Sequence, residues 1–321
     1  MLINVNTITC RAMRKQTMKK GNTTKIISRS IKEKIIRCFF FLCSLISVGI
    51  LGLILFSLSN EGLPLFKTVA LGDFVLGMEW YPTFAPPSFG IFPLIVASLI
   101  VTFISMIFAV PISILLAIFI AEVAPKSIRG TAKAVVELLA GLPSVVLGFL
   151  GMVVIAPFLQ DAFNLPTGLN IINASLILSV MAIPTITSLA EDAINAVPKE
   201  YRAASYALCA TKFETILFVI IPCALSGIST AIILGMARVI GETMVVLMVA
   251  GGASALPESI FDSVRPMPAS IAAEMGETPY GSLHYQALFA IGIVLFFITL
   301  AFNFLADYLS HKFREGGSAS L

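Results

Sequence analysis

The sequence predicts an all-α protein that crosses a membrane six times. Its composition, its long apolar runs and the placement of its basic residues all support this. Of the 321 residues, 58% are hydrophobic and only 12% are charged, and the mean hydropathy is +0.97. A soluble domain is typically about a quarter charged residues. Much of this protein's surface therefore faces something other than water.

Six runs are long and apolar enough to cross a bilayer, which takes about 20 residues in a helix. They cover residues 38–58, 91–121, 134–159, 171–190, 215–249 and 285–305. The fifth run is long enough to tilt or to include an interfacial turn. Several runs contain proline or glycine, which membrane helices tolerate and which favour kinks and close packing; these include Pro111, Pro143, Pro184, Pro222, Gly141, Gly148 and Gly151.

Lysine and arginine lie almost entirely on one side of these runs. Eighteen occur in the N-terminal leader, the second-to-third loop, the fourth-to-fifth loop and the tail, whereas the alternate loops hold only Lys67 and Arg265. Basic loops stay in the cytoplasm. We therefore expect both termini to be cytoplasmic, in a multi-pass protein of the cell inner (cytoplasmic) membrane.

The chain divides by composition into four segments. Residues 1–30 form a basic leader that we expect to be poorly ordered, and residues 31–90 carry the first span and an outward loop. Residues 91–310 are the main transmembrane domain, and 311–321 a cytoplasmic tail. The first span has a 37-residue leader and no A-x-A site after it, so we interpret it as a retained helix rather than a signal peptide.

The sequence contains none of the common short motifs for disulfide frameworks, metal sites, hydrolytic active sites or ATP binding. The five cysteines form no C-x-x-C pair, so we expect neither a disulfide framework nor a metal site. The two histidines, His284 and His311, lie near membrane edges, and neither H-E-x-x-H nor G-x-S-x-G occurs. No G-x-x-x-x-G-K-[ST] motif for ATP is present either. We therefore expect no catalytic residues and no cofactor.

One charged pair, Arg238 and Glu242, falls inside the fifth run. At a spacing of four they would share one face of a helix. A charge at mid-bilayer costs about 2.5–3.5 kcal/mol, so such residues are functional candidates. One interpretation is an ion pair that fixes helix packing. The other is that Arg238 contacts an anion in a substrate pathway.

A guanidinium suits two oxygens of a tetrahedral oxyanion. Glu242 would then hold Arg238 in place or accept a proton-bearing oxygen, which favours hydrogen phosphate over sulfate. Gly235 and Gly241 would thin the helix and leave room for a small ligand. Glu137, at the start of the third run, is a candidate for the pathway or its cytoplasmic mouth, or an interfacial carboxylate.

The fourth-to-fifth loop predicts a helical hairpin. Pro198 is a good first residue for a helix, strong helix formers follow it, and a break is expected near residues 209–211. The loop resembles the coupling helix of permeases of ABC importers, in which Glu-Ala-Ala is followed by a glycine and later a proline. Ala203 stands at the position of the glutamate and Cys209 at that of the glycine. A left-handed backbone there costs a non-glycine residue roughly 1–2 kcal/mol.

Three further stretches resemble phosphate-specific permeases. Residues 137–144 (ELLAGLPS) are similar to their third-span motif, 237–244 (ARVIGETM) to their intramembrane Arg/Glu motif, and 266–277 (PMPASIAAEMGE) to the last outward loop of the PstC branch. The resemblance covers about residues 30–310. It implies the type I fold of ABC-importer permeases and a channel-forming subunit that moves inorganic phosphate.

The resemblance also implies the partners: a PstA-like second permease, two PstB-like ATPase subunits and an external phosphate-binding protein. The ATPases would bind a coupling loop made of Ala203, Ala204, Ser205, Cys209, Ala210 and Thr211. The residues alone indicate only a small anion, so a phosphonate or molybdate permease is an alternative. An ion-coupled secondary transporter would usually show inverted repeats, and we find none.

Overall fold

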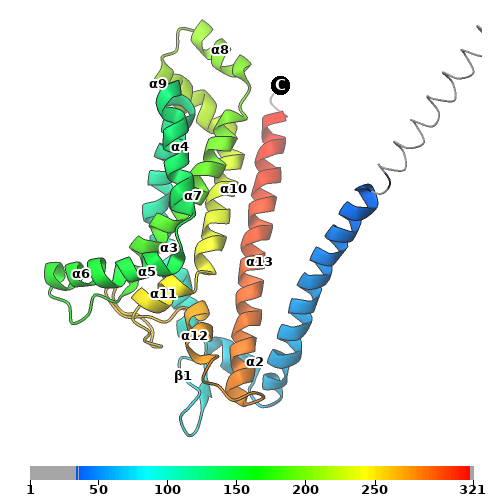
Figure 1. Ribbon diagram of the computed structural model, residues 1–321, viewed down its shortest axis with the longest axis vertical. Coiled ribbons are helices and arrows are strands. Elements are labelled where there is room, and N and C mark those ends of the chain that lie inside the picture. Colours follow the sequence, from blue (N-terminus) through cyan, green and yellow to red (C-terminus); the bar gives the residue numbers. More distant parts are fainter. Residues whose placement is uncertain (1–33, 35, 319–321) are drawn as a thin grey trace, which may run out of the picture. The chain divides into compact units, whose positions relative to one another are not determined.

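The computed structural model describes residue 34 and residues 36–318, and its contacts divide the chain into two units, Met1–Ser57 and Leu58–Leu321 (Figure 1). In the first unit, the described residues from Ile36 onward are helical and mostly apolar, and aromatic side chains such as Phe39 and Phe40 are exposed on this helix. A helix that exposes apolar side chains all round belongs in lipid. The predicted disorder of residues 1–30 lies outside the described residues.

The prediction of six spans is confirmed. Within the described part of the chain, six helices have the length and composition to cross a membrane. They are Ile36–Lys67, Phe92–Val123, Ser144–Phe163, Ile171–Asn195, Lys212–Ile240 and Leu283–Tyr308.

The second unit is built on four long helices that lie side by side (Figure 1). They are α3 (Phe92–Ile118), α7 (Ile171–Asn195), α10 (Ile221–Ile240) and α13 (Leu283–Ser318). The amphipathic helix α4 (Lys126–Ala140) packs along α7. The shared core consists of small and β-branched side chains that let the helices approach closely, among them Ala109, Ala182, Ile186, Ala190 and Ala231.

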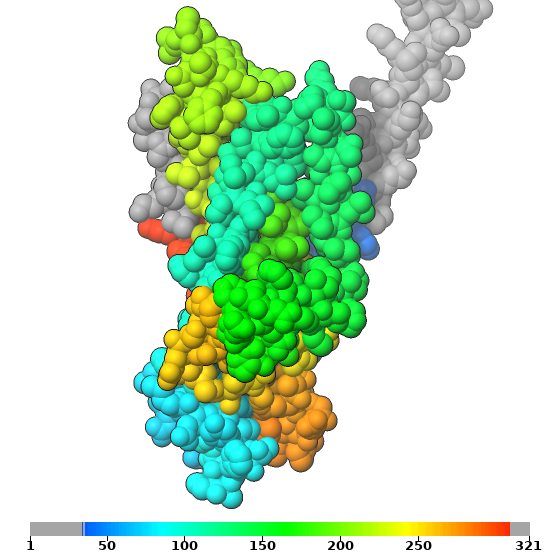
Figure 2. Space-filling view, turned by 90° about the vertical axis from the view of Figure 1, so that its left-hand side faces the viewer, coloured from blue at the N-terminus to red at the C-terminus, as the bar shows by residue number. Residues whose placement is uncertain are grey.

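Smaller elements cover the two ends of this bundle. At one end a hairpin of α8 (Lys199–Ala207) and α9 (Lys212–Thr215) projects, as Figures 1 and 2 show. At the other end lie η1 (Leu63–Lys67), α2 (Leu71–Leu76), α12 (Met267–Glu274) and an antiparallel pair, β1 (Trp80–Tyr81) with β2 (Ser88–Phe89). These end elements share a second core, which includes Leu65, Phe74, Trp80, Phe89 and Met267.

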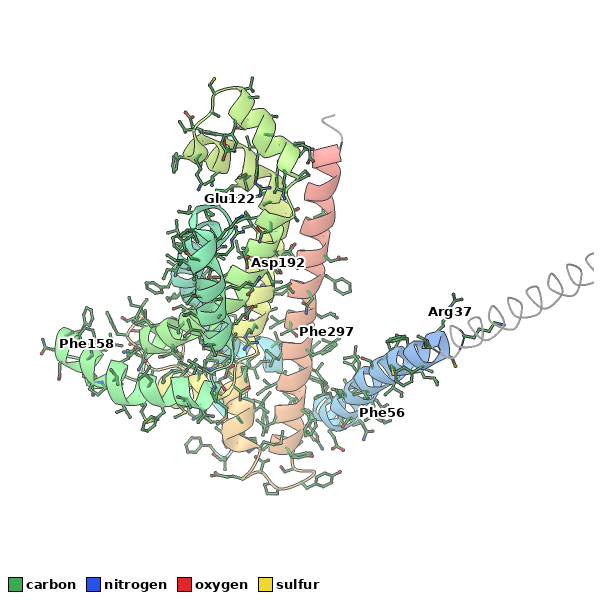
Figure 3. The ribbon with its side chains drawn as sticks, turned by 45° about the horizontal axis from the view of Figure 1, so that its top comes forward. Arg37, Phe56, Glu122, Phe158, Asp192 and Phe297 are labelled. Atoms are coloured by element: carbon green, nitrogen blue, oxygen red, sulfur yellow. The ribbon has the colours of Figure 1, made fainter. Side chains whose placement is uncertain are left out.

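The predicted third span, residues 134–159, is wrong in its bounds. The chain leaves the helix at Gly141–Pro143, because the backbone of Pro143 is extended (ψ 133°), and it starts again with α5 (Ser144–Leu150) and α6 (Ala156–Phe163). Together these run crosswise to α7 in Figure 1 and project toward the viewer in Figure 2. The side chain of Phe158 on α6 is exposed and points away from the bundle (Figure 3).

Three short π-helical segments interrupt the helices. They are η2 (Phe119–Val123), η3 (Gly151–Ile155) and η4 (Ile216–Ile220). Each ends two residues before a proline: Pro125, Pro157 and Pro222 respectively. A proline lacks the N–H that would bond the carbonyl four residues earlier, and its ring clashes with that carbonyl. In η3 and η4, whose helices continue through the proline, that carbonyl belongs to the middle residue of the π segment, and the wider turn accommodates it; η2 instead ends its helix before Pro125.

The predicted fifth span, residues 215–249, is two helices rather than one. α10 ends at Ile240, and Gly241 to Thr243 link it to the separate helix α11 (Met244–Val249), which packs against α5. Because residues on both sides of this link are apolar, the sequence reads as a single run.

Candidate functional site

Arg238 lies in the last turn of α10, on an exposed face. Within the residues that the structure describes, it makes no hydrogen bond or ion pair. Met244 and Leu247, on the following helix, are also exposed. Figure 1 shows α12 and β1 beyond the end of α10. Arg238 belongs to Lys212–Ile240, which is long and apolar enough to cross a membrane, and a guanidinium without a partner in such a helix needs a polar environment.

Glu242 does not share a helix face with Arg238, and that expectation is wrong because α10 ends between them. The Oε1 atom of Glu242 instead accepts a long hydrogen bond, 3.4 Å, from the backbone N–H of Val245 at the start of α11. Glu242 also lines a cavity of about 10 Å³ beside the hydroxyl-bearing residues Ser98 and Thr102 of α3. That volume holds about one water molecule. The half-buried Glu242 thus makes no ion pair with Arg238 among the described residues and shares a small cavity with residues of α3.

The two glycines near the pair have different roles. A Cβ on Gly235 would lie 2.5 Å from Cγ1 of Ile186, so this glycine lets α10 approach α7 and leaves no room for a ligand. A Cβ on Gly241 would meet nothing nearer than 3.8 Å. Of these two glycines, Gly241 is therefore the one that leaves space beside its backbone.

Glu137 lies on α4 and not at the start of a span, which corrects the sequence interpretation. Its side chain is exposed. One turn away, the ammonium of Lys133 donates to Oε2 of Glu191 on α7 at 2.9 Å, and Asp192 lies 3.9 Å from it. The hydrogen bond to Glu191 is the main reason that the pKa of Lys133 is raised above its usual 10.5. Figure 3 shows Asp192 on α7.

The hairpin of α8 and α9 turns through Cys209, which adopts the left-handed conformation with φ +59°. This is the position at which permeases with the coupling-helix pattern carry glycine. Thr211 then caps α9: its hydroxyl accepts from the N–H of Glu214, and the Glu214 carboxylate accepts from the N–H of Thr211. Such a reciprocal capping box fixes where the second helix begins.

The predicted coupling residues divide between the surface and the interior of this hairpin. Ala203, Ala204, Cys209 and Thr211 are exposed, and Ala210 is half-buried. Ser205 is buried, and its hydroxyl lies 2.9 Å from that of Thr215. Sequence reasoning missed two larger apolar side chains, Leu208 and Phe213, which are 84% and 72% exposed. These two side chains lie on either side of the turn between α8 and α9.

A second missed feature is the side chain of Arg202, just before the predicted coupling residues. It forms an ion pair with Glu122 of η2 at 2.7 Å. Figure 3 shows Glu122 near the hairpin end of the bundle. The sequence analysis counted Arg202 only as a cytoplasmic charge, and its partner is 80 positions away.

At the opposite end, Glu274 of α12 collects three donors. The indole N–H of Trp80 lies 3.1 Å from its Oε1, Arg265 pairs with the same oxygen, and Nε2 of His284 lies 2.7 Å from Oε2. This cluster joins β1, the segment after α11, α12 and the start of α13. It fixes that end of the bundle and leaves no carboxylate oxygen free for a ligand.

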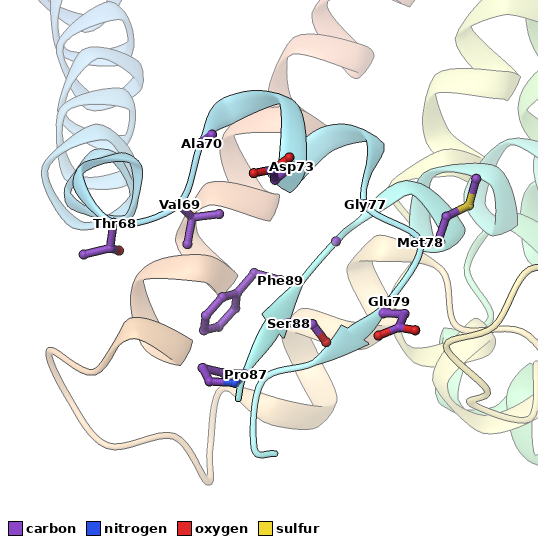
Figure 4. Close-up of a pocket in the computed structure, with 11 residues that line it drawn as sticks. Thr68, Val69, Ala70, Asp73, Gly77, Met78, Glu79, Pro87, Ser88 and Phe89 are labelled. Carbon is purple, nitrogen blue, oxygen red and sulfur yellow. The ribbon is translucent and has the colours of Figure 1, made fainter. Parts of the chain in front are cut away.

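A larger cavity, of about 470 Å³, lies at the same end between α2 and the β1–β2 pair (Figure 4). Asp73 and Glu79 are the charged residues that line it. Two carboxylates repel an anion, so this cavity is not an anion site. The anion-binding candidate therefore remains the exposed face around Arg238.

Comparison with known proteins agrees with this arrangement. Residues 113–315 match the family described as binding-protein-dependent transport system inner membrane component. A probable ABC transporter permease protein, YqgH of Bacillus subtilis, is 38% identical over 287 residues, which are 89% of this chain and 93% of that protein. A phosphate transport system permease protein PstC of Mesorhizobium japonicum is 32% identical over 256 residues, which are 74% and 77% of the two chains.

Solved structures show the same fold at low sequence identity. A chain of a bacterial alginate ABC transporter has a TM-score of 0.60 at 17% identity, with 87% of this chain and 96% of that chain covered. A chain of the MetNI methionine ABC transporter has a TM-score of 0.54 at 21% identity, with 68% and 93% covered. The all-α fold is thus that of type I ABC-importer permeases. This multi-pass membrane protein belongs to the family of inner membrane components of binding-protein-dependent transport systems, the permease subunits of ABC importers.

Proposed function

We propose that this chain is a channel-forming subunit of an ATP-driven importer that moves inorganic phosphate across the cytoplasmic membrane. The observation that carries the proposal is the exposed guanidinium of Arg238, which has no partner among the described residues. Lipid cannot cover it without a large cost. A second permease subunit against this face would enclose it in a polar pathway, where a tetrahedral oxyanion could pair with its planar fork.

Phosphate is the preferred substrate on two grounds. Relatives that cover about three quarters of this chain, such as the protein of Mesorhizobium japonicum, are phosphate permeases by name. Glu242 is close in sequence to Arg238 and accepts only a weak hydrogen bond within the chain. Its carboxylate could accept the proton of hydrogen phosphate, which sulfate lacks near neutral pH. Glu137, exposed on α4, is proposed to lie at the cytoplasmic mouth.

The partners follow from the family. We propose a PstA-like second permease, two PstB-like ATPase subunits and an extracytoplasmic phosphate-binding protein. The ATPase would bind the hairpin end, where Ala203, Ala204, Cys209 and Thr211 are exposed beside Leu208 and Phe213. We propose that the hairpin and both termini are cytoplasmic, an orientation that the distribution of basic residues among the loops supports.

The test is uptake of radiolabelled phosphate in cells that lack their own phosphate permease subunit. The chain is co-expressed with its partners as wild type, as Arg238→Ala and as the control Lys126→Ala, which removes an exposed charge from α4. We expect wild type and control to restore uptake that excess sulfate does not suppress. Arg238→Ala should assemble and move no phosphate. If Arg238→Ala fails to assemble, Arg238 instead fixes packing.

Two further arms of the same assay separate the alternatives. Uptake of phosphonate or molybdate in place of phosphate would reassign the substrate. Uptake that survives inactivation of the ATPase and stops when the proton gradient is collapsed would indicate an ion-coupled secondary transporter. A crosslink from Cys209 to the ATPase tests the docking site, and failure at every exposed hairpin position would reject it.

A further inference from the structure

The side chain of Arg202 fastens the hairpin to the bundle. Its Nε and Nη2 atoms donate to Oε1 of Glu122 at 3.0 and 2.7 Å. Nη2 also donates to the carbonyl of Ile194 at 2.9 Å, and Nη1 donates to the carbonyl of Val197. The side chains of Arg202 and Glu122 are only 17% and 12% exposed. All three guanidinium nitrogens are therefore used, in a site largely shielded from water.

The acceptors come from the ends of two different spans. Glu122 belongs to η2, the π segment that follows α3. Ile194 and Val197 lie at the end of α7, where a helix leaves its last carbonyls without partners and attracts a cation. Arg202 thus joins α8 to the ends of both α3 and α7.

A second bond closes the hairpin itself. The hydroxyl of Ser205 on α8 lies 2.9 Å from the hydroxyl of Thr215, the last residue of α9, which runs directly into η4 and α10. The exposed side chains of Leu208 and Phe213 take part neither in this bond nor in the contacts of Arg202. The hairpin can therefore bind a partner with one surface while Arg202 holds it to the ends of α3 and α7.

We propose that Arg202 is a positioning residue that transmits displacement of the hairpin to α3 and α7. The inference rests on the proposed function, in which an ATPase binds the hairpin. Arginine is suited to this because its rigid fork meets three acceptors at once, whereas lysine offers a single point charge on a flexible stem. With lysine at this position the hairpin would still present Leu208 and Phe213. It would pivot at its other connections instead of moving the spans.

Arg202→Lys is the test variant, and Arg129→Lys is its matched control. Arg129 donates from Nε to the carbonyl of Ile120 at 2.6 Å, so it bonds the same π segment without touching α8. Spin labels are placed at Ala207 on α8 and Leu115 on α3, both exposed, in the assembled complex with the native cysteines replaced by serine. We expect one narrow distance distribution in the parent and in Arg129→Lys, and a broad one in Arg202→Lys.

The second readout is the amount of phosphate moved per ATP hydrolysed. In Arg202→Lys we expect this ratio to fall about tenfold, the scale of an ordinary coupling free energy between sites. ATP hydrolysis itself and the Cys209 crosslink to the ATPase should persist. Equal label distances in all three proteins, or a fall in Arg129→Lys as large as that in Arg202→Lys, would overturn the inference. Failure of the wild type to move phosphate would reject the proposed substrate, while the label distances would still decide the role of Arg202.

Discussion

The hydroxyls of Ser205 and Thr215 meet at 2.9 Å and close the hairpin whose turn is Cys209. Thr215 also donates to the carbonyl of Thr211 at 2.9 Å. The two short helices are therefore held together both by a buried polar contact and by the capping box at Thr211. Between them, Cys209 has to adopt φ +59°, a conformation that suits glycine and costs other residues free energy.

We predict that Cys209→Gly stabilises the hairpin by about 1 kcal/mol, because glycine adopts the left-handed region without a Cβ clash. Hydrogen exchange of the amides from Lys199 to Thr215 is the measurement, and exchange should slow. Ala204→Gly is the matched control. It places glycine inside α8, where it costs about 1 kcal/mol, and should speed exchange. If hydrogen exchange is instead faster in Cys209→Gly than in wild type, the left-handed backbone at Cys209 does not destabilise this turn.

The number of spans could be predicted from sequence, but the ends of two of them could not. Hydropathy identified all six candidate helices because a bilayer demands about 20 apolar residues. It missed the break at Gly141–Pro143 and did not locate the turn at Gly241–Thr243 within the fifth run, because apolar residues continue on both sides of each break. The π segments η3 and η4 each surround the carbonyl four residues before a proline, but Pro111 and Pro184 lie inside α3 and α7 without one, so the prolines alone do not predict them.

The site was predictable only in part for a similar reason. Arg238 could be identified as a candidate because placing any charged side chain within the bilayer costs free energy. Whether Glu242 faced it depended on where α10 ends, which a four-residue spacing does not reveal. The contact between Arg202 and Glu122 joins residues 80 positions apart, and only the packing of α3 against α7 brings them together.

We predict that Gly235→Ala destabilises the protein by about 1–3 kcal/mol, the usual cost of overpacking a core. The new Cβ would lie 2.5 Å from Cγ1 of Ile186, so α10 would have to move away from α7. Heat unfolding of the purified chain in detergent, followed by circular dichroism, is the measurement.

Two further variants make this result specific to the helix contact. Gly241→Ala is the control, because its Cβ meets open space and its backbone is in the right-handed region, so its unfolding temperature should match wild type. Removing the obstacle with Ile186→Ala should lessen the cost of Gly235→Ala. If Gly235→Ala and Gly241→Ala change the unfolding temperature by the same amount, the close approach of α10 to α7 does not explain why position 235 carries glycine.

We predict that the contact between α4 and α7 weakens at alkaline pH. The hydrogen bond to Glu191 raises the pKa of Lys133 above 10.5. Its contribution is therefore complete below pH 10.5, and it is lost as the pH rises through the higher pKa of the folded state. The side chain of Lys133 is 40% exposed, so the contribution is at most about 1 kcal/mol.

The measurement is the unfolding temperature at pH 7, 9 and 11. Other groups titrate in the same range, so the informative quantity is the difference between wild type and Lys133→Gln. That difference should favour wild type at pH 7 and 9 and shrink at pH 11. Lys126→Gln, an exposed lysine on the same helix, should show no such change. A difference that stays constant to pH 11 would argue against the ion pair.

Glu242→Gln tests whether this carboxylate accepts a hydrogen bond from the proton of hydrogen phosphate. The amide oxygen can still accept from the N–H of Val245, so α11 should keep its start. The side chain can now also donate, which permits a bond to a fully deprotonated oxyanion. A hydrogen bond to a charged group contributes about 1.5–3 kcal/mol, so preference for phosphate over sulfate should fall by about ten- to a hundredfold.

Uptake of labelled phosphate against graded sulfate measures this preference directly. Glu258→Gln, at an exposed carboxylate of the loop after α11, should keep the wild-type preference. If sulfate competes no better in Glu242→Gln than in wild type, selectivity arises elsewhere, and Glu242 serves the fold through its contact with α11.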